Sequence, residues 1–229
     1  MTIQFVGAAS AEAASVTLPT HQAGDLIVLF AWNGGSLTVP TNPSGWFVIR
    51  RWSRSNNANR AGVIAYRMAT SAAETSGTWT NAALIGVAIY RDDVNILALG
   101  GDRCNTEINS TNFPYNGLPI YTSIANNTLG KMRSESGWVI GIGGANINDQ
   151  SLETPPSGMI NRTNLAGASI NEISIHDTDG NVSSWPSTNV TLASTTVGVS
   201  CVLEIFDSGI AKSSGGGVRQ VNIRGGADQ

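Results

Sequence analysis

The chain has 229 residues, a formal net charge of −3 and only 13% charged side chains, so its composition predicts no basic surface for nucleic acid. An apolar content of 41% argues against intrinsic disorder, and no apolar run approaches the roughly 18 residues of a membrane-spanning helix. Residues 1–5 also lack the basic and apolar regions of a secretory signal. We therefore expect a folded chain with no nucleic-acid partner and no membrane insertion.

Strand-like segments follow one another along the chain. Apart from a short helix-friendly stretch at residues 8–14 that leads into a strand at 15–18, the sequence shows little helical periodicity. The segments are rich in β-branched and aromatic residues and are bounded by Gly, Pro, Asn or Ser. They cover residues 25–32, 46–52, 61–66, 82–90, 137–142, 170–175 and 197–206.

This pattern predicts an all-β fold, a two-sheet antiparallel β-sandwich of about eight strands that resembles a jelly roll. Residues 25–32 and 82–90 are apolar on both alternating faces, which predicts central positions in a sheet. Residues 92–132 are rich in Gly, Pro, Asn and Thr, and we interpret them as a long connection with two short strands.

Two halves of the chain carry similar signals in the same order. The tripeptide Pro-Ser-Gly at residues 43–45 recurs at 156–158, and the glycine that precedes an apolar strand at position 24 recurs at the same offset, at position 137. We interpret residues of about 15–95 and 133–208 as half-repeats that together form one sandwich domain, 1–211, with pseudo-twofold symmetry. Chance recurrence of a common turn tripeptide is the alternative.

Catalytic and redox motifs are not evident. His21 and His176 are read as polar turn histidines, and no serine stands in a nucleophile-elbow pattern. Cys104 and Cys201 form no metal or redox motif, and we interpret them as two buried thiols. We expect no enzyme.

One acidic segment resembles half of a calcium loop. Asp177, Asp179 and Asn181 supply oxygen atoms at alternate positions, as a hard cation requires. The loop lacks its third acidic position and its distal Glu, and Asp-Gly is also a common hairpin turn, which we favour. We expect no cofactor, and a cation at these three residues stays open as the alternative.

Six tryptophans stand at the ends of predicted strands. We interpret most of them as plugs of the sandwich core, and Trp52 as the best candidate for exposure. Its neighbours Arg51, Arg54 and Arg60 suggest a loop that binds glycans or acidic protein surfaces. A solvated hairpin tip is the alternative.

The C-terminal arm, residues 212–229, begins with a Gly/Ser-rich linker and continues with a short strand-like segment. We predict that Val218, Val221, Ile223 and Arg224 bind a neighbouring sheet edge by strand addition, which would give a homo-oligomer. A final edge strand within the same chain is the alternative.

Three segments resemble a family of virion proteins from tailed bacteriophages and prophages. In that family an AGDLLV strand is followed by a PAGW turn and an SGTWTNA turn, before a strand that ends in YR. Here the segments read HQAGDLIVLF at 21–30, PSGW at 43–46 and ETSGTWTN at 74–81, and Tyr90 and Arg91 end the last strand. The resemblance implies a β-sandwich virion component and carries no catalytic residues to this chain.

From the resemblance and the composition we expect a non-enzymatic structural protein of a phage particle, assembled in the bacterial cytoplasm. It would be a tail or tail-fibre adaptor or a host-surface-binding module, with other virion proteins, further copies of itself and a host-surface glycan as partners. A capsid decoration protein and a carbohydrate-binding module are the alternatives.

Overall fold

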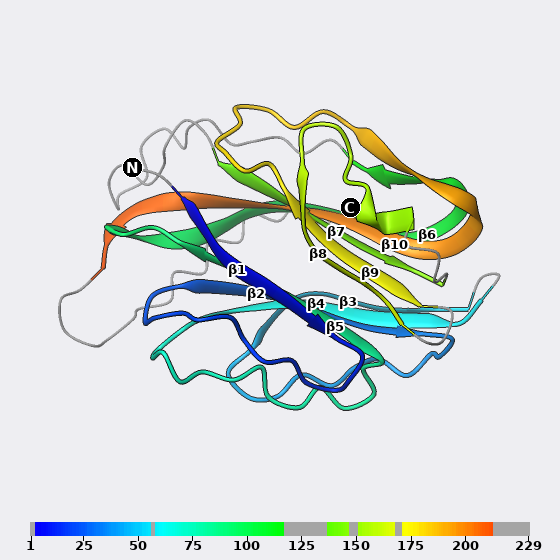
Figure 1. Ribbon diagram of the computed structural model, residues 1–229, viewed down its shortest axis with the longest axis horizontal. Coiled ribbons are helices and arrows are strands. Elements are labelled where there is room, and N and C mark those ends of the chain that lie inside the picture. The colour runs from blue at the N-terminus through cyan, green and yellow to red at the C-terminus, as the bar shows by residue number, and fades with distance from the viewer. Residues whose placement is uncertain (1–2, 56–57, 117–136, 147–150, 168–170, 213–229) are drawn as a thin grey trace.

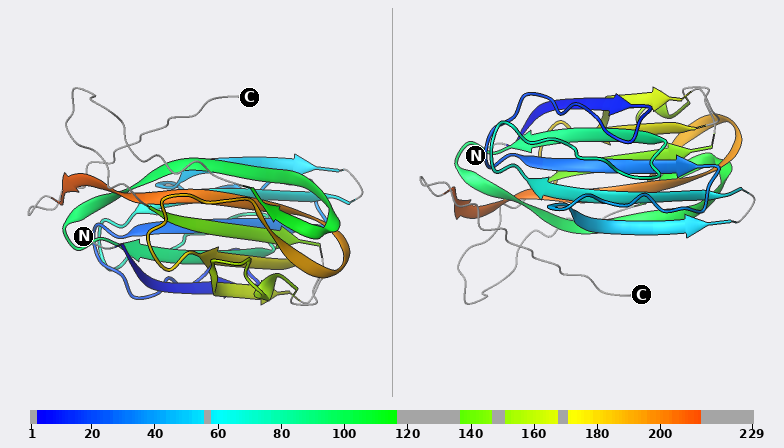
Figure 2. Two further views of the ribbon diagram at one scale, coloured as in Figure 1. Left: turned by 90° about the horizontal axis from the view of Figure 1, so that it is seen from above. Right: turned by 90° about the horizontal axis from the view of Figure 1, so that it is seen from below.

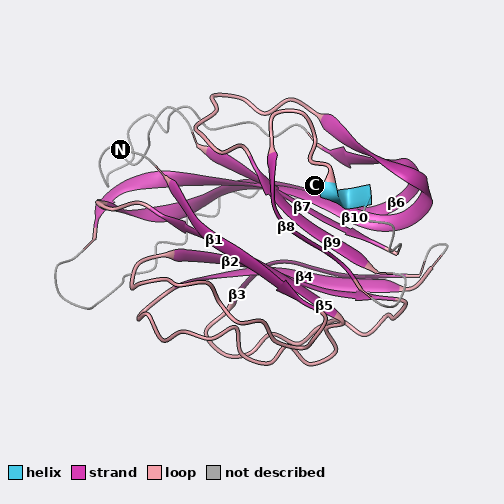
Figure 3. Cartoon of the chain, in the orientation of Figure 1, coloured by secondary structure: helices cyan, strands magenta, loops and turns pink. Residues whose placement is uncertain are grey.

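The computed structural model describes residues 3–55, 58–116, 137–146, 151–167 and 171–212, which form two five-stranded antiparallel sheets packed face to face (Figure 1). The first sheet has the order β1-β5-β2-β4-β3, and the second β6-β10-β7-β9-β8. Figure 3 shows that strands dominate the fold, and the three-residue helix η1 (Ser151–Glu153) is the single helical element in the described ranges. The predicted all-β sandwich is therefore confirmed.

The strands have these bounds: β1 (Gln4–Ala11), β2 (Leu26–Gly34), β3 (Phe47–Arg54), β4 (Arg60–Met68), β5 (Leu84–Arg91), β6 (Asn95–Tyr115), β7 (Trp138–Ala145), β8 (Ile160–Ala166), β9 (Glu172–Asp177) and β10 (Thr188–Ala211).

The central strand β2 is buried on both of its faces. Val28 and Phe30 point into the core between the two sheets, whereas Ile27 and Leu29 point to the outer side of the first sheet, where they pack with Trp79. The connections between the strands cover this outer side (Figure 1). Burial on both sides explains why the strand is apolar from Leu26 to Trp32, and the sheet order confirms its predicted central place.

The second sheet contains two strands that are much longer than expected. β6 and β10 pair along most of their length, and register shifts interrupt the ladder at several points. Such irregularities let a ribbon bend, and the bent ends return over the outer side of their own sheet, where Phe113, Tyr115 and Val190 are buried (Figure 1). The interpretation of residues 92–132 as a long connection is thus wrong for 95–115, and residues 117–132 lie outside the described ranges.

The two sheets are built in the same way. When β1 to β5 are matched in order with β6 to β10, the strand order of the first sheet becomes that of the second. Across the sandwich β1 contacts β8 and β3 contacts β6, two pairs that a twofold axis interchanges. Each half supplies five strands rather than the predicted four. The additional strands are β1, whose alanines favour a helix locally, and β6, whose sequence resembles a loop. Each half also completes its own sheet, whereas a jelly roll passes strands between sheets.

The repeated turn tripeptide adopts one conformation in both halves. Gly45 and Gly158 have φ angles of 82° and 87°, in the left-handed region that favours glycine. Gly45 leads directly into Trp46, whose ring lies edge-on to Trp79 with the ring centroids 5.4 Å apart. The repeated tripeptide is thus a turn that the backbone requires at equivalent places in the two sheets.

Cys104 and Cys201 form a disulfide, so their interpretation as two buried thiols is wrong. The two residues stand directly opposite each other in the β6–β10 ladder, with a Cα–Cα distance of 4.1 Å. A separation of 97 positions in the sequence does not indicate this pairing. The pairing follows from the register of β6 and β10, whose lengths were not predicted.

Candidate functional site

Trp52 lies in the core and not on the surface. Its side chain is 5% exposed, and its ring stacks on Phe30 with the centroids 6.0 Å apart. Gly62 on the neighbouring strand leaves room for it, since a Cβ there would come within 2.5 Å of the indole ring. The expected exposure of Trp52 is therefore wrong, and the ring offers no face to a sugar. All six tryptophans are buried, as the core interpretation predicted.

The three arginines predicted beside Trp52 do not form one surface. Arg60 is buried, and its guanidinium donates hydrogen bonds to the carbonyl oxygens of Ala58 at 3.1 Å and Thr106 at 3.0 Å. Arg51 is exposed and Arg54 is half-buried, both on the edge strand β3. Arg60 therefore ties β4 to β6, and its predicted place in a ligand-binding loop is not supported by its position.

The residues predicted to bind a partner, Val218, Val221, Ile223 and Arg224, lie outside the described ranges. Their role stays a prediction.

The acidic segment at the end of β9 surrounds an arginine. The Arg162 guanidinium donates to Asp177 at 2.7 Å and to Asp179 at 2.5 Å, and it lies 4.0 Å from the centroid of the Phe5 ring. Asp177 is fully buried, whereas Asn181 is exposed. Asp179 has a φ of 48° in the segment after β9, but β7 lies between β9 and β10 in the sheet, so the predicted hairpin turn is wrong. Both carboxylates form ion pairs with the one guanidinium, and within the described residues no cluster of three or more His, Cys, Asp or Glu suits a metal ion.

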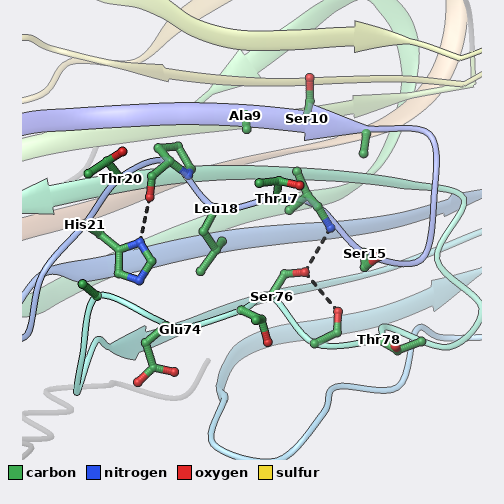
Figure 4. Close-up of a pocket in the computed structure, with 16 residues that line it drawn as sticks. Ala9, Ser10, Ser15, Thr17, Leu18, Thr20, His21, Glu74, Ser76 and Thr78 are labelled. Atoms are coloured by element: carbon green, nitrogen blue, oxygen red, sulfur yellow. Dashed lines mark hydrogen bonds between the residues drawn. The ribbon is translucent and has the colours of Figure 1, made fainter.

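A groove of about 820 Å³ is the candidate binding site on the surface of the first sheet (Figure 4). It lies between residues 9–21, at the end of β1 and in the connection after it, and residues 72–78, which precede β5. Its lining is rich in serine and threonine and includes His21 and Glu74.

Hydrogen bonds within the protein occupy several polar groups of this groove, and His21 Nε2 is buried there without a hydrogen-bond partner in the described residues. His21 Nδ1 donates to the Pro19 carbonyl oxygen at 2.7 Å, and the Ser76 hydroxyl accepts from the Val16 amide at 3.0 Å (Figure 4). Burial raises the pKa of Glu74, but hydrogen bonds from Thr70 and the nearby Arg67 charge outweigh it, so the pKa lies below its ordinary value. These groups hold the two connections together, which suits binding or bracing better than proton transfer.

A second polar cluster is closed off beneath η1. Glu172, Ser174 and His176 stand at alternate positions of β9 on the outer side of the second sheet, and all three are fully buried. Glu172 Oε1 accepts from the Leu152 amide at 2.8 Å. The Ser174 and Tyr115 hydroxyl oxygens both lie over Gly143. A Cβ at this glycine would come within 2.9 Å of each of them.

His176 is held neutral at the centre of this cluster. Its Nε2 lies 3.0 Å from the Leu152 carbonyl oxygen, an acceptor, so Nε2 carries the proton and Nδ1 accepts from the Tyr115 hydroxyl at 3.3 Å. Burial lowers the pKa of His176 to about 4. The interpretation of His176 as a turn histidine is wrong. Polar and apolar residues alternate along β9, and η1 and the bent end of β6 cover its polar side.

We expect acid to destabilise the protein through His176. Its folded pKa lies below its ordinary value of 6.5, so the unfolded chain binds this proton more readily and stability falls as the pH falls from about 6.5 towards 4. The free energy of unfolding, measured with urea, should lose about 2 to 3 kcal/mol more between pH 7 and pH 4.5 in the natural protein than in His176→Gln. An equal loss in both proteins would contradict this account.

Comparison with family models, with curated proteins and with solved structures finds no match for this chain. No helix in the described ranges is long and apolar enough to span a lipid bilayer.

Proposed function

We propose that this chain is a non-enzymatic structural module of a tailed-bacteriophage particle, a tail or tail-fibre adaptor that assembles through its C-terminal arm. The observation that carries the proposal is the shared interior of the two sheets. Residues of both halves, such as Phe30 and Ile64 from the first and Ile142 and Leu203 from the second, pack into one apolar cluster. A domain with one continuous core is a rigid block, which suits transmission of contacts between neighbours in a particle.

The three segments that resemble the virion family support the proposal through their place in the fold. They form turns or strand starts of the first sheet, where Gly24, Gly45 and Gly77 all have φ angles in the left-handed region. Trp46 and Trp79, which belong to two of these segments, contact each other on the outer side of that sheet. The resembling residues therefore form one structural unit rather than scattered matches.

The state of the polar groups also favours a scaffold. His21 Nδ1 and the Ser76 hydroxyl in the groove are engaged by nearby backbone groups, His21 Nε2 is buried, and His176 is enclosed in the sheet. A catalyst needs a nucleophile or base that can reach a substrate. These groups instead stabilise the connections that cover the two sheets.

Purified particles test the proposal. Phage particles from a bacterium that carries this gene should contain the chain, detected by mass spectrometry, and gold-labelled antibodies against it should bind the tail. Labels over the head would contradict the tail adaptor and would support the alternative, a capsid decoration protein. Particles without the chain would contradict both.

A further inference from the structure

Four strands lie at the edges of the two sheets, and they differ in how they are protected against pairing with another chain. β3, β6 and β8 each contain charged residues, with three arginines on β3, whereas β1 contains neither a charged residue nor a proline. Figure 2 shows β1 along the rim of its sheet. Charges and prolines on edge strands discourage the addition of further strands, so β1 is the edge best suited to accept one.

The C-terminal arm leaves the sandwich close to the start of β1. The Lys212 amide donates to the Val94 carbonyl oxygen at 2.9 Å, and the neighbouring Asp93 accepts a hydrogen bond from the Gln4 side chain at 2.9 Å. Figures 1 and 2 place the end of β10 and the start of β1 at the same end of the sandwich. Val94 at this point is 50% exposed. The arm therefore begins beside one end of the uncharged edge.

The reach of the arm decides which copy of the chain it pairs with. Every strand pair in the described residues is antiparallel, the more stable arrangement. Antiparallel pairing of residues 218–224 with β1 places Val218 beside Ser10 or Ala11, about 20–23 Å along the strand from Gln4. The six steps from Lys212 to Val218 span at most about 20–22 Å. Pairing within one chain would therefore require a fully extended linker, whereas pairing with a second copy would not.

We propose that residues 218–224 of one copy add to the free edge of β1 on a second copy, as an antiparallel strand. This inference rests on the proposed assembly function and names the surface that it uses. As a strand, residues 218–224 would place Arg219, Val221 and Ile223 on one of their alternating faces and Val218, Gln220, Asn222 and Arg224 on the other. β1 is uncharged, so the two arginines of this segment would meet no like charge on it.

Two matched double variants of the full chain test the proposal. Val221→Lys with Ile223→Lys removes the apolar face of the arm, and Gln220→Lys with Asn222→Lys adds the same charges to its polar face. Light scattering over a range of protein concentrations measures self-association. We expect an oligomer in the natural chain, a dissociation constant at least about a hundredfold higher in the first variant, and a much smaller change in the second. A monomeric natural chain, or equal effects of the two variants, would overturn the proposal.

Hydrogen exchange measured by mass spectrometry locates the contact. In the oligomer the amides of residues 4–11 should exchange more slowly than in the monomer, and this protection should disappear in Val221→Lys with Ile223→Lys. Protection at residues 47–54, 95–115 or 160–166 instead would overturn the choice of β1. These results are independent of the particle experiment. A monomer that is nevertheless found in particles refutes the β1 contact alone, and an oligomer that is missing from particles refutes the virion function alone.

Discussion

Replacing Asp177 by Asn should lower the free energy of unfolding by about 3 kcal/mol, measured by urea denaturation at pH 7. Asp177 is fully buried and accepts hydrogen bonds from Arg162 at 2.7 Å and from Tyr90 at 3.0 Å. Burial, and then the Asp177 charge, raise the pKa of Tyr90, so its hydroxyl stays protonated and donates. Removal of one partner leaves a largely buried guanidinium without its chief counter-charge, a change that costs about 3 to 5 kcal/mol in proteins.

The expected loss lies at the lower end of this range because Asp179 still contacts Arg162. Asp179→Asn is the matched control. Its side chain is 56% exposed, so solvent screens the interaction and the loss should stay below about 1 kcal/mol. Similar losses in the two variants would show that the burial of Asp177 does not determine the strength of this cluster.

Reduction of the Cys104–Cys201 disulfide should lower the free energy of unfolding by about 3 to 4 kcal/mol, with a fall in Tm of about 10 °C. The disulfide joins residues 97 positions apart, and a closed loop of that length restricts the unfolded chain strongly. Thermal unfolding with and without a reductant measures the effect, and thiol titration confirms that the bond is broken.

Cys104→Ala with Cys201→Ala is the control for the reductant. This variant should unfold near the temperature of the reduced natural chain and should not respond to the reductant. An unchanged Tm in fully reduced natural protein would contradict the expected role of the disulfide.

The sequence predicted the architecture where a strand has the same environment along its whole length. Residues 26–32 and 84–90 are buried on both faces, so nearly every position carries the same apolar signal. The repeated glycine turns were visible for a similar reason, because only a few residues tolerate a left-handed φ. β1 and β6 were missed because alanines, glycines and polar residues carry a weak strand signal, and tertiary pairing determines their conformation.

The candidate sites were harder to predict, because long-range packing decides whether a polar or aromatic residue is exposed. Trp52 stands among arginines in the sequence, yet Gly62 on the neighbouring strand makes a place for its ring in the core. His176 lies in a regular alternating strand, and residues far from it in the sequence cover its polar face. The groove beside His21 forms between two connections separated by three strands, and no local pattern marks it.

The two sheets have the same strand order and lie in one chain, so their packing against each other does not depend on protein concentration. One half on its own would be a sheet with an apolar face exposed to solvent. Two separate halves would associate only at sufficient protein concentration. Joined in a single polypeptide, they meet at a high effective concentration that does not depend on how many molecules are present. Within one polypeptide the two halves can also differ from each other, as their corresponding edge strands do, since β1 is uncharged and β6 contains charged residues.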